Sequence, residues 1–237
     1  MATEAAEQRR QAISVQSGAA RAAVLGVSDG LVTNVSLILG VVGATANPEF
    51  VRIAGLASLV AGACSMAVGE YISMRAQVEL LCRLLLNERE AMRDDPSHER
   101  KVLERTLKSR GIDARTARTV SAELARNPKT ALASYAREVL GIDPDELGSP
   151  WASAISSLLT FALGAFIPLI AWLVAADSRP IMTSLALSAI GALTVGGVLG
   201  YLADRRIWRF AFRQLLLVVL ASGITFLVGR LLGTMVT

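Results

Sequence analysis

The chain has 237 residues, of which 53% are apolar, with a mean hydropathy of +0.49 and a formal net charge of +4. An apolar content this high, with the charges gathered in blocks, is typical of an integral membrane protein. Residues 76–150 hold 13 basic and 13 acidic side chains, so the one long polar stretch is neutral and suggests no nucleic-acid partner. Two cysteines without a CxxC pair give no basis for a structural disulfide or a zinc site.

We predict an all-α membrane protein with five transmembrane helices and a helical insert between the second and the third. Each predicted span can cross a hydrocarbon core of about 30 Å at a rise of about 1.5 Å per residue. The spans are residues 23–44, 51–74, 151–176, 180–203 and 210–236. The predicted domains are a cytoplasmic N-terminal segment (1–22), helices one and two (23–74), a cytoplasmic helical domain (75–150) and helices three to five (151–237).

The basic residues of the short loops indicate the orientation, because the side richer in Lys and Arg stays in the cytoplasm. The N-terminal segment and the turn after the fourth span form the richer side. Its arginines are Arg9, Arg10, Arg21, Arg205, Arg206 and Arg209, against Arg52 and Arg179 on the other side. We therefore expect the N-terminus and residues 75–150 in the cytoplasm and the C-terminus outside, in a prokaryotic plasma membrane.

Two predicted spans contain a carboxylate, Asp29 in the first and Glu70 in the second. An acidic side chain at bilayer depth is costly and must face a partner, a cation or a water-filled cavity. Met66, Glu70 and Met74 recur every fourth residue and so share one face of their helix. Thioether sulfur combined with carboxylate oxygen suits Fe²⁺ or Mn²⁺ better than Mg²⁺. These four residues are the candidate metal ligands. A carboxylate that binds a proton when no metal is present would couple metal transport to proton transport.

Other interpretations of these positions stay open. Met66 and Met74 are also compatible with simple packing. Glu70 could pair with an arginine, although Arg52 and Arg75 lie near opposite interfaces and neither reaches it easily. Asn34 and Ser36 could supply oxygen ligands or could form hydrogen bonds between helices.

Within the insert we predict four helical segments. The second span continues without Pro or Gly to residue 92, and Asp94-Asp95-Pro96 ends it. A helix over 96–110 is closed by Gly111, a third begins after its N-terminal cap Asp113, and a fourth over 129–140 ends at Gly141. Apolar residues recur at three- and four-residue spacing, so each segment has a face that needs a neighbour.

Three stretches of the sequence resemble the vacuolar iron transporter family. They are Asp29-Gly30, Ser65-Met-Ala-Val-Gly-Glu-Tyr-Ile-Ser73 and Leu140-Gly-Ile-Asp-Pro-Asp-Glu-Leu-Gly-Ser-Pro150. The resemblance covers nearly the whole chain from about Arg21 onward. It implies a homodimer that exports Fe²⁺, and often Mn²⁺, from the cytosol in exchange for protons. Divalent metal ions, protons and membrane lipid are then the expected partners, and no tightly bound cofactor is expected.

The insert departs from the family pattern. In the family, metal is bound by glutamates three residues apart on two helices and by a methionine with glutamates on the last helix. The corresponding positions here are Glu88, Ala91, Glu99, Val102, Tyr135, Ala136 and Val139. Only Glu88 and Glu99 remain as candidate ligands. The balanced charge favours a salt-bridged surface over a cation cage, which puts metal binding by the insert in doubt.

Two other functions are compatible with this sequence. The chain could keep the family fold as a non-transporting interaction or regulatory protein, because the insert lacks most of the expected glutamates. It could also transport a different divalent ion. No Ser-His-Asp arrangement or phosphate-cradling glycine loop is present, and we do not expect an enzyme.

Overall fold

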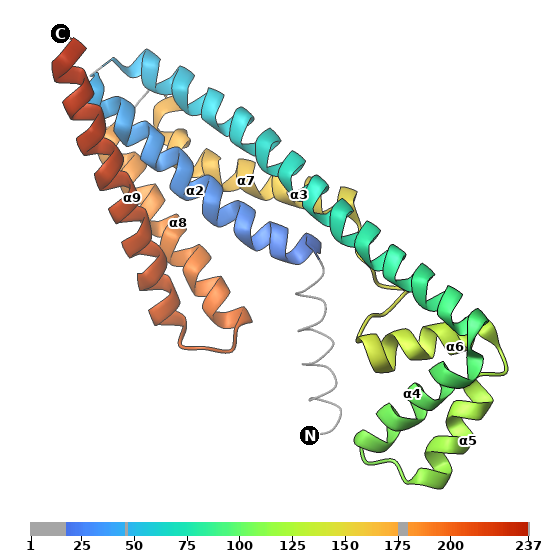
Figure 1. Cartoon of the computed structure of the whole chain (residues 1–237). Helices are drawn as coiled ribbons and strands as arrows, with labels where there is room; N and C mark the ends of the chain where they lie inside the picture. The colour runs from blue at the N-terminus through green and yellow to red at the C-terminus, as the bar shows by residue number, and fades with distance from the viewer. Residues whose placement is uncertain (1–17, 46, 175–179, 237) are drawn as a thin grey trace. The chain divides into compact units, whose positions relative to one another are not determined.

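The computed structural model describes residues 18–45, 47–174 and 180–236 (Figure 1). Its helices are α2 (Gly18–Ala44), α3 (Pro48–Asp94), α4 (Pro96–Ser109), α5 (Ala114–Leu124), α6 (Pro128–Tyr135), the π-helix η1 (Ala136–Leu140), α7 (Pro150–Leu173), α8 (Pro180–Leu202) and α9 (Ile207–Val236). The chain forms two compact units. The membrane unit takes in the chain up to Ile72 and from Pro150 onward, and the insert is Ser73–Ser149.

The five predicted spans are confirmed as helices, and the chain is a multi-pass membrane protein. Within the described residues, α2, α3, α7, α8 and α9 are long and apolar enough to cross a bilayer. The third span ends at Leu173, before the predicted residue 176, and the fifth begins at Ile207 instead of residue 210. Residues 175–179, with Arg179, and the N-terminal Arg9 and Arg10 lie outside the described residues.

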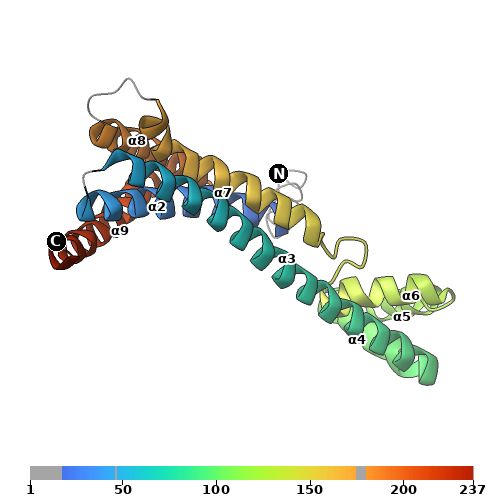
Figure 2. The ribbon, with the colours of Figure 1, turned by 90° about the horizontal axis from the view of Figure 1, so that it is seen from above.

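In the membrane unit, α2 packs on α7, α8 and α9 (Figures 1 and 2). Glycines allow the closest approaches. A Cβ at Gly30 would fall within 3.0 Å of the Phe161 carbonyl group on α7, and one at Gly229 on α9 would meet Gly40 on α2 in the same way. Such contacts suit a bilayer, where van der Waals packing of small residues replaces the hydrophobic effect between helices.

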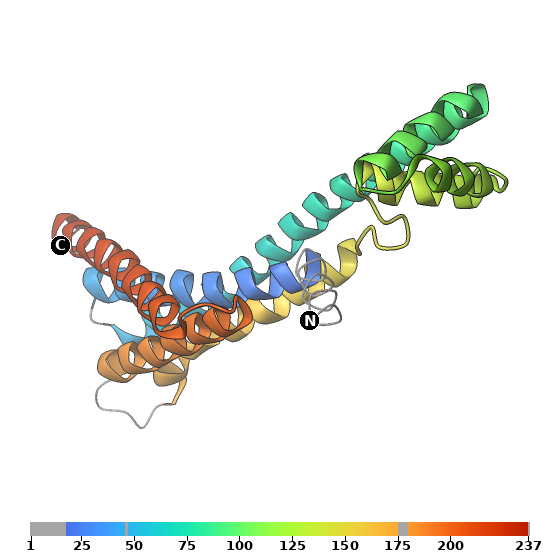
Figure 3. The same cartoon turned by 90° about the horizontal axis from the view of Figure 1, so that it is seen from below.

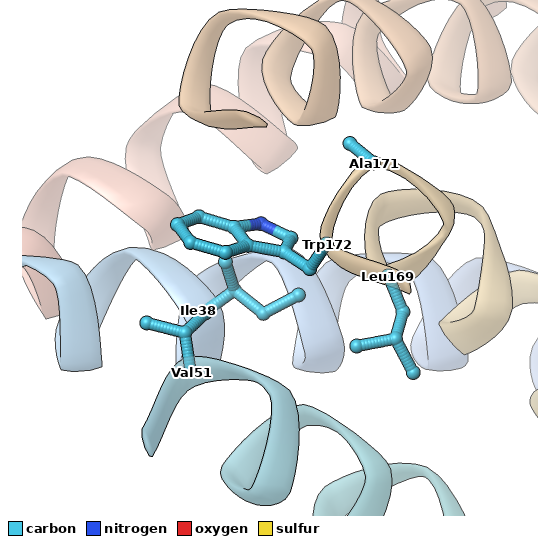
Figure 4. Close-up of a cluster of buried hydrophobic side chains, with 5 residues drawn as sticks. All are labelled: Ile38, Val51, Leu169, Ala171 and Trp172. Atoms are coloured by element: carbon cyan, nitrogen blue, oxygen red, sulfur yellow. The ribbon is translucent and has the colours of Figure 1, made fainter. Parts of the chain in front are cut away.

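The start of α3 joins this bundle through an apolar cluster. Ile38 of α2, Val51 of α3 and Leu169 and Trp172 of α7 are almost fully buried together. Figure 4 shows the Trp172 indole beside Ile38, while Ala171 points away from them on the other side of α7. A helix hairpin formed by α2 and α3 is therefore anchored on α7.

The ends of the membrane helices form two sets. At one end, Ser156 Oγ donates to the Ala19 carbonyl at 2.9 Å, and the Tyr71 and Trp151 rings lie 4.9 Å apart. Gln214 Nε2 donates to Ser28 Oγ at 2.8 Å, while Gly229 meets Gly40, so α2 and α9 run parallel. The turn between α8 and α9, with Arg205 and Arg206, and the first turn of α9, with Arg209, are therefore level with Arg21 at the start of α2. We call this the basic end; it groups the arginines as the sequence predicted.

The helices of the insert, green to yellow-green in Figure 3, begin and end close to the predicted caps. Asp95 accepts hydrogen bonds from the backbone N–H groups of Ser97 and His98, and Asp113 accepts equivalent bonds at the start of α5. Gly111 and Gly141 have φ values of +91° and +69°, as expected of residues that end helices. The last segment differs from prediction, because α6 continues as the π-helix η1 instead of an α-helix. The wider π turn has no signal in helix propensity.

Candidate membrane metal site

Asp29 lies on the outward face of α2. Gly26 and Gly30 hold another face of this helix against α7, so α2 cannot turn Asp29 inward. The carboxylate is exposed, and its Oδ1 accepts a hydrogen bond from Thr33 Oγ1, one turn away, at 3.1 Å. An exposed carboxylate in an apolar span requires a molecule other than lipid against it.

Glu70, in contrast, is buried and has an arginine partner. Its side chain is 10% exposed, and Arg21 Nη2 lies 3.4 Å from Glu70 Oε2. Arg52 and Arg75, which the sequence did not place within easy reach of Glu70, have other partners. Arg52 Nε donates to the Trp172 carbonyl at 2.7 Å, and Arg75 Nε donates to Glu79 at 2.6 Å. Sequence reasoning missed Arg21 because only the antiparallel hairpin of α2 and α3 brings it level with Glu70.

The two methionines that flank Glu70 in the sequence also make packing contacts with other residues. Met66 is half-buried against the cluster of Ala63, Phe161 and Ala165. Met74 is 4% exposed, and its Sδ lies 3.0 Å from the position that a Cβ at Gly148 would take. Met66 and Glu70 lie one turn apart on the membrane part of α3 and share one helix face, whereas Met74 belongs to the insert unit. Whether they bind a metal stays a prediction.

The candidate ligands of one chain lie in series and form no single cage. Within the described ranges, no three His, Cys, Asp or Glu side chains converge on one point. Arg21, which marks the level of Glu70, precedes Asp29 by eight residues, or about 12 Å along a helix. Met66 is one turn from Glu70, about 6 Å along α3. An ion that used these groups would move from one to the next.

Asn34 and Ser36 form hydrogen bonds between helices. Asn34 Nδ2 donates to the Ala165 carbonyl on α7 at 2.5 Å, and Ser36 Oγ lies 3.5 Å from Ser222 Oγ on α9. Both residues are buried and make the hydrogen bonds that the packing interpretation expects, while Asn34 Oδ1 has no hydrogen-bond partner among the described residues.

Gln214 is a polar residue of this region that sequence reasoning missed. It is 8% exposed on α9, and its side chain bonds to Ser28, the neighbour of Asp29. Its position in a membrane span was a usable signal, since a buried amide needs a partner on another helix.

A family comparison covers most of this architecture. The model of the VIT family matches residues 20–230, which include both carboxylates, the insert and all five spans. The chain belongs to the VIT family.

Plant relatives align over nearly the whole VIT chain. Vacuolar iron transporter homolog 2 of Oryza sativa subsp. japonica is 33% identical over 90% of this chain and 90% of its own length. Vacuolar iron transporter 1 of Eucalyptus grandis is 27% identical over 93% of this chain and 89% of its own. Vacuolar iron transporter 1 of Arabidopsis thaliana is 26% identical, over 87% and 83%. The resemblance seen in the sequence motifs is confirmed.

At the positions where the family pattern expects metal ligands on the last helical segment, this VIT chain has buried or apolar side chains. Ala136 is fully buried, Tyr135 is 7% exposed, and Val139 packs on the core of Leu103, Leu107 and Ala117. Glu88 is half-buried on α3, and the side chain of Glu99 lies outside the described residues. Metal binding by Glu88 and Glu99 of the insert stays a prediction.

Several carboxylates of the insert are paired with basic residues, as the balanced charge predicted. Glu104 Oε1 lies 2.7 Å from Lys108 Nζ and 3.7 Å from Arg118 Nε, and these bonds and charges lower the pKa of Glu104. The partner of Glu138 is Arg110, 28 residues earlier in the chain, and not its sequence neighbour Arg137. Arg137 pairs with Asp143 at 3.0 Å and with Asp145 at 2.6 Å. The loop after Gly141 brings these aspartates back to η1, which spacing along the sequence did not reveal.

Proposed function

We propose that this VIT chain transports divalent metal ions, Fe²⁺ and also Mn²⁺, out of the cytosol in exchange for protons. The observation that carries the proposal is the exposed Asp29 in the apolar helix α2. Carboxylates inside membrane spans mark ion and proton pathways. The names of the plant relatives, vacuolar iron transporters, support iron as the cargo.

A second copy of the chain is the proposed partner of Asp29. The outward face of α3 carries small exposed residues, and a Cβ at Gly69 would meet no atom within 4 Å. These residues are Ala57, Ala61, Cys64, Ser65 and Gly69. Small residues let helices approach closely in a bilayer, so this face suits a helix of another copy. In such a dimer the two Asp29 side chains would line a shared pathway.

In the proposed cycle Arg21 and the metal ion compete for Glu70. Arg21 neutralises the Glu70 carboxylate while no metal is bound, which avoids an unpaired buried charge. A divalent ion that arrives from the basic end replaces Arg21 and gains a thioether ligand from Met66, one turn further along. The ion then moves to Asp29, and a proton taken up by the vacated carboxylate restores neutrality. Glu88 and Glu99 have no part in this cycle.

Metal flux into proteoliposomes tests the transport. The chain would be reconstituted with a pH gradient, and uptake of Fe²⁺, Mn²⁺ and Zn²⁺ measured with and without it. We expect Asp29→Asn and Glu70→Gln to lower the flux roughly tenfold or more, as the loss of a metal ligand does. The matched control is Glu49→Gln, an exposed carboxylate in the first turn of α3.

Unchanged flux in both variants would refute the pathway. Flux of Mn²⁺ or another ion without Fe²⁺ would leave the mechanism standing and change the cargo. No flux of any ion from folded protein would favour the interaction or regulatory role.

Cross-linking tests the dimer separately. Cys64 is exposed on the small-residue face of α3, and Cys82 is exposed in the insert. With Cys82→Ser as the background, mild oxidation in membranes should yield a disulfide-linked dimer through Cys64. The same treatment of a Cys64→Ser chain is the control. Absence of the linked dimer in the Cys82→Ser protein would argue against this interface.

A further inference from the structure

The insert contains a cavity of about 820 Å³ with a basic lining. Two arginines come from α3, Arg89 and Arg93; Arg100 comes from α4, and Lys129 comes from the start of α6. They lie 40 residues apart at most in the sequence, on three helices, and the fold of the insert brings them to one cavity. Its volume is within the range of about 300–1,000 Å³ that is usual for small-molecule sites.

These four cations lack ion-pair partners among the side chains that the structure describes. The acidic residue on the described lining, Asp145, accepts a hydrogen bond from Arg137 at 2.6 Å, an arginine that Asp143 shares, and its single charge offsets only part of the four cations. Glu104 lies one turn from Arg100 and interacts with its charge, but Lys108 at 2.7 Å and Arg118 at 3.7 Å are the ion-pair partners of Glu104. The described lining is therefore positive, which disfavours a metal ion and favours an anion.

The rest of the lining is mainly apolar. Met92, Leu103 and Leu132 contribute to it, together with the buried ring of Tyr135. An inorganic anion would use the cations and leave this surface unused. A ligand with an anionic part and a flat apolar part would use both, and an aromatic base can pack on a tyrosine ring.

Phosphate is the anion that best matches the lining. The guanidinium fork of arginine bonds two phosphate oxygens at once, and three of the four cations are arginines. We propose that this cavity of the insert binds a soluble phosphorylated ligand of nucleotide size, with its phosphates on Arg89, Arg93, Arg100 and Lys129 and its apolar part against the Tyr135 side. The proposal goes beyond metal transport and does not depend on it.

Binding to the full-length chain tests the proposal. The chain would be placed in nanodiscs of zwitterionic phosphatidylcholine, and ATP and pyrophosphate titrated by calorimetry. We expect saturable binding of one ATP per chain, with pyrophosphate weaker because it lacks the apolar part. The Arg93→Gln/Arg100→Gln variant should bind ATP at least about tenfold more weakly, since charge-assisted bonds to phosphate are lost.

The matched control is Lys101→Gln/Arg105→Gln, which removes two exposed cations of α4 that do not line the cavity. It should bind ATP within about twofold of the unaltered chain, as surface charges far from a site do. If the first variant fails to fold, as judged by its melting curve, Arg89→Gln/Lys129→Gln replaces it with the same expected loss.

Three outcomes would overturn the proposal. ATP could show no saturable binding at millimolar concentration. Both double variants could weaken ATP binding equally, which would indicate diffuse charge attraction. The chain could also ignore ATP yet bind nanodiscs that contain anionic lipid, which would assign the basic residues to a membrane surface.

Discussion

Replacing Gly30 by alanine tests the tight contact between α2 and α7. An added Cβ would fall within 3.0 Å of the Phe161 carbonyl group and 3.0 Å from the Ala165 nitrogen. Both are backbone atoms, and the Asn34 bond to the Ala165 carbonyl at 2.5 Å ties α7 to α2 at this level. The two helices would therefore have to move apart over several turns.

The expected cost follows from two opposing effects. Overpacking costs about 1–3 kcal/mol, and contact with backbone places Gly30→Ala toward the upper end. Alanine recovers up to about 1 kcal/mol of helix propensity. The net loss of about 1–2 kcal/mol corresponds to a melting temperature lower by about 2–8 °C for a chain of this length.

The matched control is Gly223→Ala on α9, where the added Cβ meets no atom within 4 Å. Its melting temperature should stay the same or rise slightly, because only helix propensity changes. Both variants would be melted in detergent at one scan rate, with tryptophan fluorescence as the probe, since unfolding of membrane proteins is commonly irreversible. Equal melting temperatures for Gly30→Ala and the unaltered chain would refute the packing argument.

Three further predictions concern polar groups. Arg21→Gln should lower the Fe²⁺ concentration for half-maximal flux about two- to fivefold, because the half-exposed arginine no longer competes for Glu70; an unchanged value would remove Arg21 from the cycle. Asn34→Leu should lower the melting temperature, since the buried Ala165 carbonyl loses its donor; a higher melting temperature would contradict this. Hydrogen bonds from Ser97 and the His98 N–H lower the pKa of Asp95. The stabilisation of α4 by Asp95 is therefore present above the ordinary carboxyl pKa of 3.8, and it is lost as the pH falls through the lowered pKa of the folded protein. Amide exchange in the first turn of α4, in Asp95→Ala and the unaltered chain, should differ at pH 7 and converge in acid.

Local features of the fold could be predicted from the sequence. The spans follow from the length of the apolar stretches, which a bilayer selects directly. The insert helices begin at Asp95 and Asp113 because each carboxylate bonds N–H groups two and three residues away, a short-range contact visible in the sequence. The outward direction of Asp29 and the pairing of Glu70 with Arg21 could not be predicted in this way, because they depend on contacts between helices.

Contacts between helices were decided by the tertiary structure. Arg21 meets Glu70 across 49 residues because the consecutive helices α2 and α3 run in opposite directions, and no local pattern encodes their relative height. The basic cavity likewise combines residues from three helices that each look like ordinary solvated surface in the sequence. The sequence by itself determined which residues enter the membrane and where helices begin, since these depend on hydrophobicity and short-range hydrogen bonds. Which charged groups then meet depends on helix register, and only the packed structure determines that register.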